Sequence, residues 1–292
     1  MPLTRLLQKS FTGFAERVGS MPGLDPIAAR IHAVNEPLFG PEGNQALKDA
    51  LYGTWLGHPL HPVMTDLPIG FWTSSFVLDL AGMERGADIT LKLGTISAVG
   101  TAITGYAQWH DLQELDEPRR IGTLHAMLNI AAAGSYAVSW ALRDTGRRRA
   151  GYLASLTGLS LVSVSGLLGG DLAYRLGIGV NHSAFEDPPG EWTPVAILAE
   201  LPEGELVRLE ESATPLMVLR TGDEVHVTSA LCTHLGAPLD EGELNGTCVT
   251  CPWHGSVFDV EDGAAIHGPA TTPLPSLESR VREGMVEVRT RV

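Results

Sequence analysis

The stretches Cys232-Thr233-His234-Leu235-Gly236 and Cys251-Pro252-Trp253-His254-Gly255 determine the fold of the last third of the chain. Each stretch pairs one thiol with one imidazole. Two thiolates can bind one iron of a [2Fe-2S] cluster, and two neutral imidazoles can bind the other iron. A cluster with two neutral ligands is easier to reduce than one with four thiolates. The residues therefore predict a one-electron transfer centre whose metal ligands are Cys232, His234, Cys251 and His254.

The spacing of these ligands, C-x-H, sixteen residues and then C-x-x-H, resembles that of a Rieske iron–sulfur domain. The flanking sequence is similar as well: Gly236-Ala237-Pro238-Leu239 follows the first pair, Phe258-Asp259 follows the second, and Gly268-Pro269 with Pro273 and Pro275 stands where such a domain has its proline loop. The resemblance covers roughly residues 192–292 and implies an all-β domain. A tetrahedral zinc site is the alternative use of two Cys and two His, but zinc motifs rarely combine C-x-H with C-P-W-H-G.

Departures from this family concern the surroundings of the cluster. Rieske proteins of respiratory complexes carry a disulfide beside the cluster, and the matching positions here are Ala237 and Trp253. Ser256 matches a serine whose hydroxyl could donate to a bridging sulfide, whereas Phe258 replaces a tyrosine. Fewer donors stabilise the reduced cluster less, so we expect a potential in the lower part of the range of about −150 to +300 mV. The pattern resembles the ferredoxin and oxygenase type. Cys248 is expected to be a buried strand residue.

Acidic residues dominate the part of the chain around these motifs. The 292 residues carry a formal net charge of −14, and residues 181–292 hold 19 Asp/Glu against 6 Arg and no Lys. Nucleic acid is excluded as a partner, because phosphate binding requires a basic face. The acidic face could steer a redox partner with a basic docking surface, or it could serve solubility alone. Two of the three cysteines are expected ligands, so no disulfide framework remains.

Four apolar stretches in the middle of the chain predict a membrane domain. They cover residues 67–83, 91–109, 121–142 and 151–178, and each approaches the roughly 20 residues that cross a bilayer. Small residues such as Gly94, Gly100 and Gly105 would let such helices pack closely. The alternative is a buried helix bundle in a soluble protein. Short, charged connections favour four spans in the lipid bilayer of the cell membrane.

The expected fold is therefore multidomain, α plus β, with a four-helix transmembrane bundle followed by an all-β Rieske domain. We expect N-terminal surface helices in residues 1–57, the membrane domain in 58–182, a linker in 183–191 and the cluster domain in 192–292. The segment 1–60 lacks the apolar stretch of a signal peptide.

Histidines lie at the ends of the apolar stretches: His58, His61, His110, His125 and His182. In four antiparallel spans, these ends share one side of the membrane, where the cluster domain also begins. The motif His58-Pro59-Leu60-His61-Pro62 and the four stretches resemble a family of four-helix bacterial membrane domains of unknown function. We expect His61 and His125 as axial ligands of haem b. The alternatives are another metal, a quinone site with proton exchange, or interfacial histidines bonded to carboxylates or carbonyls.

The basic segment 143–149 predicts that the loop between the third and fourth spans is cytoplasmic and that the cluster domain lies outside, although Arg119-Arg120 on the opposite side weakens this. The expected function is one-electron transfer to or from a redox partner, with no substrate site of its own. A redox sensor or assembly factor that uses the cluster as a reporter is the alternative. A component of an oxygenase system is the least favoured. A complete oxygenase is disfavoured because only His267 follows His254, and mononuclear iron needs two histidines and a carboxylate.

Overall fold

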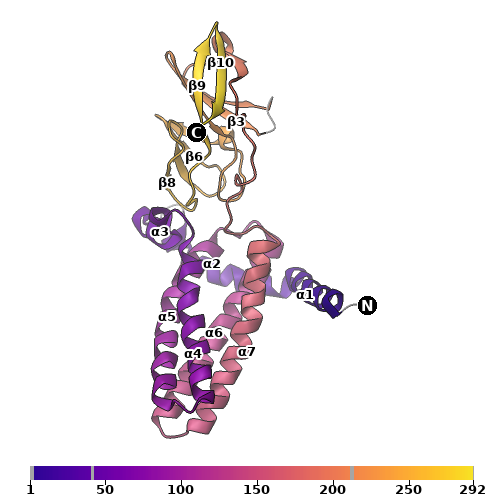
Figure 1. The fold of residues 1–292 in the computed structure, drawn as a ribbon, viewed down its shortest axis with the longest axis vertical. Coiled ribbons are helices and arrows are strands. Elements are labelled where there is room, and N and C mark those ends of the chain that lie inside the picture. Colours follow the sequence, from indigo (N-terminus) through magenta and orange to yellow (C-terminus); the bar gives the residue numbers. More distant parts are fainter. Residues whose placement is uncertain (1–2, 41–42, 211–213, 292) are drawn as a thin grey trace. The chain divides into compact units, whose positions relative to one another are not determined.

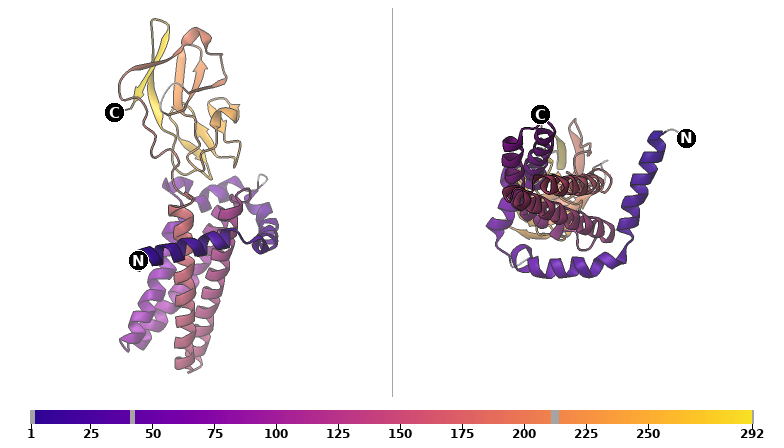
Figure 2. Two further views of the ribbon diagram at one scale, coloured as in Figure 1. Left: turned by 90° about the vertical axis from the view of Figure 1, so that its right-hand side faces the viewer. Right: turned by 90° about the horizontal axis from the view of Figure 1, so that it is seen from below.

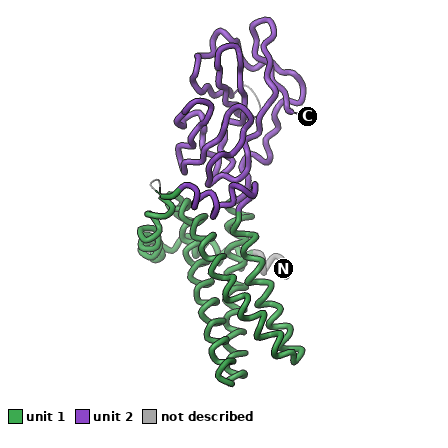
Figure 3. The backbone as a smooth tube through the Cα atoms, turned by 90° about the vertical axis from the view of Figure 1, so that its left-hand side faces the viewer, with its two compact units in different colours: residues 1–44, 60–178 green, residues 45–59, 179–292 purple. Residues whose placement is uncertain are grey.

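The computed structural model of the chain describes residues 3–40, 43–210 and 214–291. Helices fill the N-terminal part and two β-sheets fill the C-terminal part (Figure 1), which confirms the predicted order of a helical region and an all-β domain. The chain divides into two compact units, residues 1–44 with 60–178 and residues 45–59 with 179–292 (Figure 3). Residues 45–59 thus belong to the compact unit of the β-sheets.

The helical unit contains two kinds of helix. Shorter helices come first, namely α1 (Leu3–Gly19), the 3-10 turn η1 (Pro22–Leu24) and α2 (Asp25–Phe39), and the long helices follow as α4 (Leu60–Leu80), α5 (Glu84–His110), α6 (Asp116–Asp144) and α7 (Arg148–Tyr174). The long helices run side by side, and α1 crosses them on the outside (Figure 2). Ala15 and Val18 bury the inner face of α1 in an apolar cluster with Ile121 of α6 and Leu168 of α7.

The pairs α4–α5 and α6–α7 repeat one pattern along the chain. Each position of the first pair corresponds to the position 64 residues later in the second pair, and we call two such positions equivalent. Helices α5 and α7 begin at residues 84 and 148 and end at 110 and 174, and α4 and α6 end at 80 and 144. On α4, the buried hydroxyl of Ser75 donates to the carbonyl oxygen of Ala87 at 2.8 Å. On α6, Ser139 donates in the same way to the carbonyl oxygen of Gly151 at 2.7 Å. The long helices therefore form two similar hairpins.

A pair of stacked rings joins the two hairpins. Trp72 of α4 and Tyr136 of α6 hold equivalent positions, and their ring centroids lie 4.1 Å apart with planes inclined by 7°. Each ring lies over a glycine of its own hairpin. A Cβ added to Gly94 would fall 2.6 Å from the Trp72 ring, and one added to Gly158 would fall 2.7 Å from the Tyr136 ring. The two glycines thus let the helices of each hairpin approach closely.

Buried charges lie where the hairpins turn. The side chains of Asp79 and Arg143, which hold equivalent positions, are 6% and 1% exposed and form an ion pair. Arg148 and Asp88 complete the network, with Arg148 bonded to both carboxylates. Burying an ion pair is tolerated when each charge has several partners, as here. Two of the four arginines in segment 143–149 are therefore neutralised within the unit.

One long helix meets a simple measure of a membrane span. Judged by length and apolar composition alone, α7 could cross a membrane, and no other helix in the described part of the chain passes the same measure. The four predicted spans and their bundle in the bilayer therefore remain predictions.

The second unit is built around two antiparallel sheets. The larger has the order β1 (Thr193–Ile197), β10 (Met285–Thr290), β9 (Ser276–Arg282), β4 (Glu224–Ser229), β3 (Leu216–Thr221) and β2 (Leu206–Leu209), with the turn η3 (Leu198–Glu200) after β1. The smaller has the order β5 (Glu243–Asn245), β6 (Cys248–Thr250), β7 (Val257–Asp259) and β8 (Ala265–His267), and η4 (Leu239–Glu241) precedes β5. One apolar core includes Leu239, Val249 and Phe258 together with Cys232 and Cys251.

Helix α3 (Gln45–Tyr52) and the turn η2 (Thr54–Leu56) complete this unit, and η2 contacts β8. The carboxylate of Asp49 accepts a hydrogen bond from the backbone N–H of Gly268 at 2.8 Å and lies 2.8 Å from Nδ1 of His267. A Cβ on Gly268 would fall 2.7 Å from Oγ1 of Thr54. Residues 45–59 are thus held against the segment predicted as a proline loop.

Candidate metal centre

Two loops with the same backbone carry the predicted ligands. In the loop between β4 and η4, the N–H of Gly236 donates to the carbonyl oxygen of Cys232 at 2.8 Å. In the loop between β6 and β7, the N–H of Gly255 donates to the carbonyl oxygen of Cys251 at 3.1 Å. Each glycine stands four residues after its cysteine and is left-handed, with φ of 75° and 73°, a conformation that favours glycine.

The match between the loops extends one residue further. The N–H of Cys232 donates to the carbonyl oxygen of Ala237 at 2.9 Å, and the N–H of Cys251 donates to that of Ser256 at 2.8 Å. Both bonds join a cysteine to the residue five positions later. The local sequence thus folds each ligand pair into the same compact turn, although the histidine stands two residues after Cys232 and three after Cys251.

The two thiols are buried and hydrogen-bonded to each other. Cys232 and Cys251 are 1% and 3% exposed. The hydrogen bond with Cys232 lowers the pKa of the Cys251 thiol to about 7, and the same bond together with burial raises the pKa of Cys232. Backbone N–H groups also donate to the sulfurs, those of His234 and Leu235 to Cys232 and those of Trp253 and His254 to Cys251. Such donors favour thiolates, the form that binds metal.

The two imidazoles lie together beside the same loops. The ring centroids of His234 and His254 are 5.1 Å apart, and the ring planes are nearly perpendicular at 86°. Burial, helped by the nearby charges of His254 and His182, lowers the pKa of His234 to about 3. This imidazole is therefore neutral at pH 7, as a metal ligand must be. Two adjacent thiols and two adjacent imidazoles form a donor set that fits a [2Fe-2S] cluster.

The residues around the ligand loops are packed and bonded. Ser256 is fully buried, and its Oγ accepts a hydrogen bond from the N–H of Ala270 at 2.9 Å. Phe258 is also fully buried, in the apolar core that contains both ligand cysteines. Cys248 is half-buried on β6, opposite Asp259 of β7. Cys248 is thus a strand residue, less buried than predicted.

His182 lies beside the first ligand loop. Its backbone N–H donates to the carbonyl oxygen of Thr233 at 3.1 Å, and a Cβ on Gly236 would come within 3.6 Å of its ring. His182 and His58 belong to the β-sheet unit, whereas the other histidines of the predicted layer belong to the helical unit. Sequence reasoning had no signal for this division, because it placed all five by the ends of apolar stretches.

His61 and His125 occupy equivalent positions in the two hairpins, at the same offset along the chain that relates Ser75 to Ser139. Nδ1 of His61 lies 3.1 Å from the carbonyl oxygen of Thr101, and Nδ1 of His125 lies 2.8 Å from that of Ser165. Nε2 of His125 is 3.1 Å from the side-chain amide of Asn129.

Each of these two rings also lies over a glycine. A Cβ on Gly105 would fall 2.8 Å from the His61 ring, and one on Gly169 would fall 3.0 Å from the His125 ring. The structure therefore gives the two predicted haem ligands the same local setting.

Comparison with known proteins identifies two regions. Residues 191–278 match the family model described as Rieske [2Fe-2S] domain, and residues 57–182 match the one described as predicted membrane protein (DUF2231). The ferredoxin CarAc of Metapseudomonas resinovorans is 39% identical over 98 residues, which make up 33% of this chain and 92% of that protein. The anthranilate 1,2-dioxygenase ferredoxin subunit of Burkholderia cepacia is 36% identical over 98 residues, 34% of this chain and 91% of its own.

A solved structure is similar to the same part of the chain. The ferredoxin of carbazole 1,9a-dioxygenase from Nocardioides aromaticivorans IC177 has 30% sequence identity, and the match covers 35% of this chain and 100% of that one with a TM-score of 0.33.

Proposed function

This chain belongs to the Rieske [2Fe-2S] family, with a region that matches a predicted membrane protein family before the cluster domain, and on that basis we propose that it is a membrane-anchored carrier of single electrons. The matches confirm both resemblances found in the sequence. A Rieske domain binds a [2Fe-2S] cluster and transfers electrons, so the zinc alternative is set aside.

In this proposal Cys232 and Cys251 bind one iron, and His234 and His254 bind the other. The observation that carries it is the pair of matched loops, which hold two buried sulfurs together and two imidazoles 5.1 Å apart. When bound, such a cluster takes up and releases one electron. The backbone N–H groups that the protein directs at the sulfurs favour the more negative, reduced state, whereas burial of the sulfurs opposes it.

Ser256 supplies a further donor in this proposal. Its Oγ already accepts from the N–H of Ala270, so the hydroxyl hydrogen is available for donation toward the cluster. Phe258 has no hydroxyl to add, and Ala237 and Trp253 exclude the disulfide of high-potential relatives. We therefore propose that the reduction potential of the cluster lies in the lower part of the Rieske range.

The redox partner is inferred from charge and from the relatives. The two relatives described above are named as a ferredoxin and as the ferredoxin subunit of a dioxygenase, so we propose that this domain likewise passes electrons to or from another redox protein. The excess of acidic side chains in residues 181–292 favours a partner with a basic docking face. Trp253, 55% exposed beside His254, offers an apolar contact at the imidazole side of the site.

Exposed apolar side chains support the membrane anchor. Val77 of α4, Val99 of α5, Ile130 of α6 and Leu153 of α7 are each more than half exposed. Large apolar faces on every long helix are costly in water and favourable in lipid. We propose that the predicted domain 58–182 forms a four-span anchor with α4 to α7 as its spans, that 183–191 link it to the cluster domain in 192–292, and that, within the predicted segment 1–57, residues 1–44 form the surface helices, whereas 45–57 belong to the unit of the β-sheets.

The side of the membrane on which the cluster domain lies is inferred from the arginines of the 143–149 loop that do not pair with Asp79 or Asp88. Arg147 and Arg149 favour a cytoplasmic 143–149 loop, whereas Arg143 and Arg148 pair with Asp79 and Asp88. We propose that the cluster domain faces away from the cytoplasm. Reporter enzymes fused after the last residue test this: activity of a periplasmic reporter is expected, and activity of a cytoplasmic reporter alone would contradict it.

A haem b between His61 and His125 is a second redox centre in this proposal. With the proton on Nδ1 bonded to a backbone carbonyl, each imidazole presents the Nε2 lone pair that a metal requires. The amide of Asn129 would have to turn away from Nε2 of His125. A pyridine haemochrome assay on the wild type, His61→Ala and His125→Ala tests this site. A haem-free wild type with an intact cluster would leave a quinone site, another metal, or the plain structural role.

The experiment for the main function uses the full chain in detergent. Optical and electron paramagnetic resonance spectra before and after dithionite should show a cluster that is silent when oxidised and gives a Rieske signal when reduced. A chain that binds iron but gives no signal after reduction would contradict electron transfer by a Rieske cluster.

A further inference from the structure

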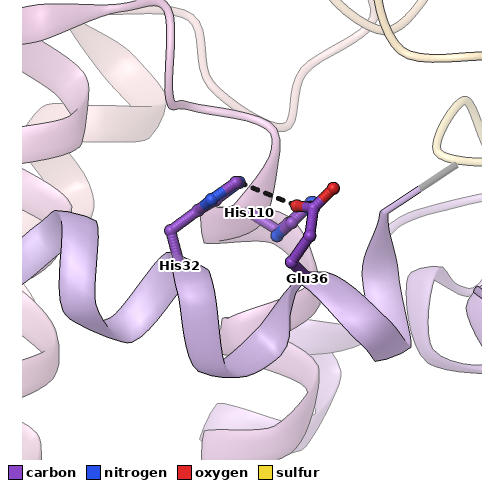
Figure 4. Close-up of side chains that lie close together, drawn as sticks. All are labelled: His32, Glu36 and His110. Atoms are coloured by element: carbon purple, nitrogen blue, oxygen red, sulfur yellow. Dashed lines mark ion pairs between the residues drawn. The ribbon is translucent and has the colours of Figure 1, made fainter.

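Three side chains outside the cluster domain converge on one point. His32 and Glu36 lie one turn apart on α2, and His110 is the last residue of α5, so all three belong to the helical unit (Figure 4). Their ligand atoms, one from each side chain, all lie within 4.8 Å of one another. Two imidazoles and one carboxylate form a donor set that binds divalent transition metals.

The distances between these atoms suit a metal better than direct hydrogen bonds. Oε2 of Glu36 lies 3.4 Å from Nε2 of His32 and 3.5 Å from Nε2 of His110. A strong charge-assisted hydrogen bond would be about 2.7–2.9 Å. Tetrahedral bonds of about 2.0–2.1 Å separate neighbouring ligand atoms by about 3.4 Å. The distance from the Glu36 carboxylate to each imidazole nitrogen therefore equals the distance between two ligand atoms bound to one zinc ion.

The two imidazoles lie together before any ion binds, and one ring has to rotate for both Nε2 lone pairs, which lie in the ring planes, to point at one metal ion. The rings of His32 and His110 are stacked, with centroids 4.4 Å apart and planes inclined by 10°. The ring centroid of Phe39 lies 6.0 Å from that of His110, with the planes inclined by 44°. The side chain of His110 is only 10% exposed, whereas that of Glu36 is 46% exposed. The site is thus closed on the His110 side and open to water at Glu36.

We propose that His32, Glu36 and His110 bind one divalent transition metal ion, with zinc as the ion that the ligand spacing fits. Two neutral imidazoles and one carboxylate leave a net charge of +1 on a divalent ion, and the open side at Glu36 admits water as the fourth ligand. The site would fix α2 to the end of α5. This inference does not depend on the cluster, because none of its ligands is a cluster ligand.

Zinc binding to the full chain with its cluster intact tests the proposal. Equilibrium dialysis against Zn²⁺, followed by metal analysis, should give one zinc per wild-type chain in addition to the cluster iron. Glu36→Gln, which keeps the side-chain shape, and His110→Ala should each weaken binding at least tenfold. The matched control is His226→Ala. His226 lies 3.9 Å from the carboxylate of Glu224 but is not one of the three proposed ligands, so this variant should bind as much zinc as the wild type.

A second measurement does not depend on the variants folding. Zinc X-ray absorption of the loaded wild type should show two imidazoles and oxygen ligands. Absence of bound zinc in the wild type, sulfur in its coordination sphere, or equal binding by Glu36→Gln and the wild type would each overturn the proposal.

Discussion

Each ligand sulfur receives two backbone N–H groups of its own loop, so the backbone itself favours thiolates at Cys232 and Cys251. Each ligand sulfur comes from the cysteine of its own loop, and the third cysteine lies outside both loops. This third cysteine, Cys248, lies on β6 and pairs with Asn245 and Asp259 in the sheet.

The first prediction concerns these cysteines. Cys232→Ala should abolish the electron paramagnetic resonance signal of the reduced cluster, because three ligands cannot complete both irons. Cys248→Ala is the matched control and should keep the signal at full intensity. A full signal in Cys232→Ala would show that the ligand assignment is wrong.

Ser256 allows a prediction about reduction potential. Removing its hydroxyl in Ser256→Ala removes one donor to the reduced cluster, and a hydrogen bond to a charged group is worth about 1.5–3 kcal/mol, or roughly 60–130 mV for one electron. The potential measured by redox titration should fall, by at most that amount, because only the difference between the bond to the reduced and the bond to the oxidised cluster changes the potential. Ser279→Ala is the control, because Ser279 bonds the carbonyl oxygen of Val225 on the larger sheet. An unchanged potential in Ser256→Ala would mean that the hydroxyl does not face the cluster.

At the scale of helices, the glycine under each stacked ring sets how closely the hairpin helices pack. Gly158→Ala places a methyl group 2.7 Å from the Tyr136 ring and should destabilise the helical unit by about 1–3 kcal/mol. Gly166→Ala on the same helix meets no atom within 4 Å and should be neutral or stabilising by up to about 1 kcal/mol. Thermal unfolding of both variants in detergent measures the difference. Equal effects would show that the close approach is not needed.

The carboxylate of Asp49 bonds helix α3 to the β-domain. Asp49→Ala removes its contacts with His267 and the Gly268 N–H and should weaken the attachment by about 1–2 kcal/mol, since the bond to a charged group is partly exposed. Amide hydrogen exchange in residues 45–52 should then become about 5–30-fold faster. Glu205→Ala, at an exposed position of the β-domain, is the control. Unchanged exchange in Asp49→Ala would place the attachment elsewhere.

The ligand loops could be predicted from sequence because each ligand pair lies within four residues and its flanking residues resemble those of a Rieske domain. Residues 45–59 could not, since the partners of Asp49 stand 218 and 219 residues away. The site at His32 and Glu36 was missed for the same reason, because His110 stands on another helix, far along the chain from Glu36. The repeat of the two hairpins is not evident in the sequence, because equivalent positions differ in residue type, as do Trp72 and Tyr136.

For the whole molecule, the question is which solvent surrounds the long helices. Val99 lies within α5 and is 62% exposed. If this face contacts lipid, Val99→Lys should destabilise the protein by about 2.5–3.5 kcal/mol, the cost of lysine near a bilayer centre. If it contacts water, the change should stay within about 0.5 kcal/mol. Folded yield in membranes and thermal unfolding measure the effect.

The control for this prediction is Ile197→Lys on β1 of the β-domain, which is 44% exposed and should be tolerated. If the protein tolerates Val99→Lys as well as Ile197→Lys, the proposal that the long helices form a membrane anchor is wrong.

The ion pair of Asp79 and Arg143 joins equivalent positions of the two hairpins. A symmetric dimer of a single hairpin would present the same residue from both copies at this point, so two buried aspartates or two buried arginines would repel each other. Carrying both hairpins on one polypeptide removes that constraint, because each copy can change independently. Opposite charges can then face each other where the two similar hairpins meet, a pairing that two identical hairpins could not supply at this point.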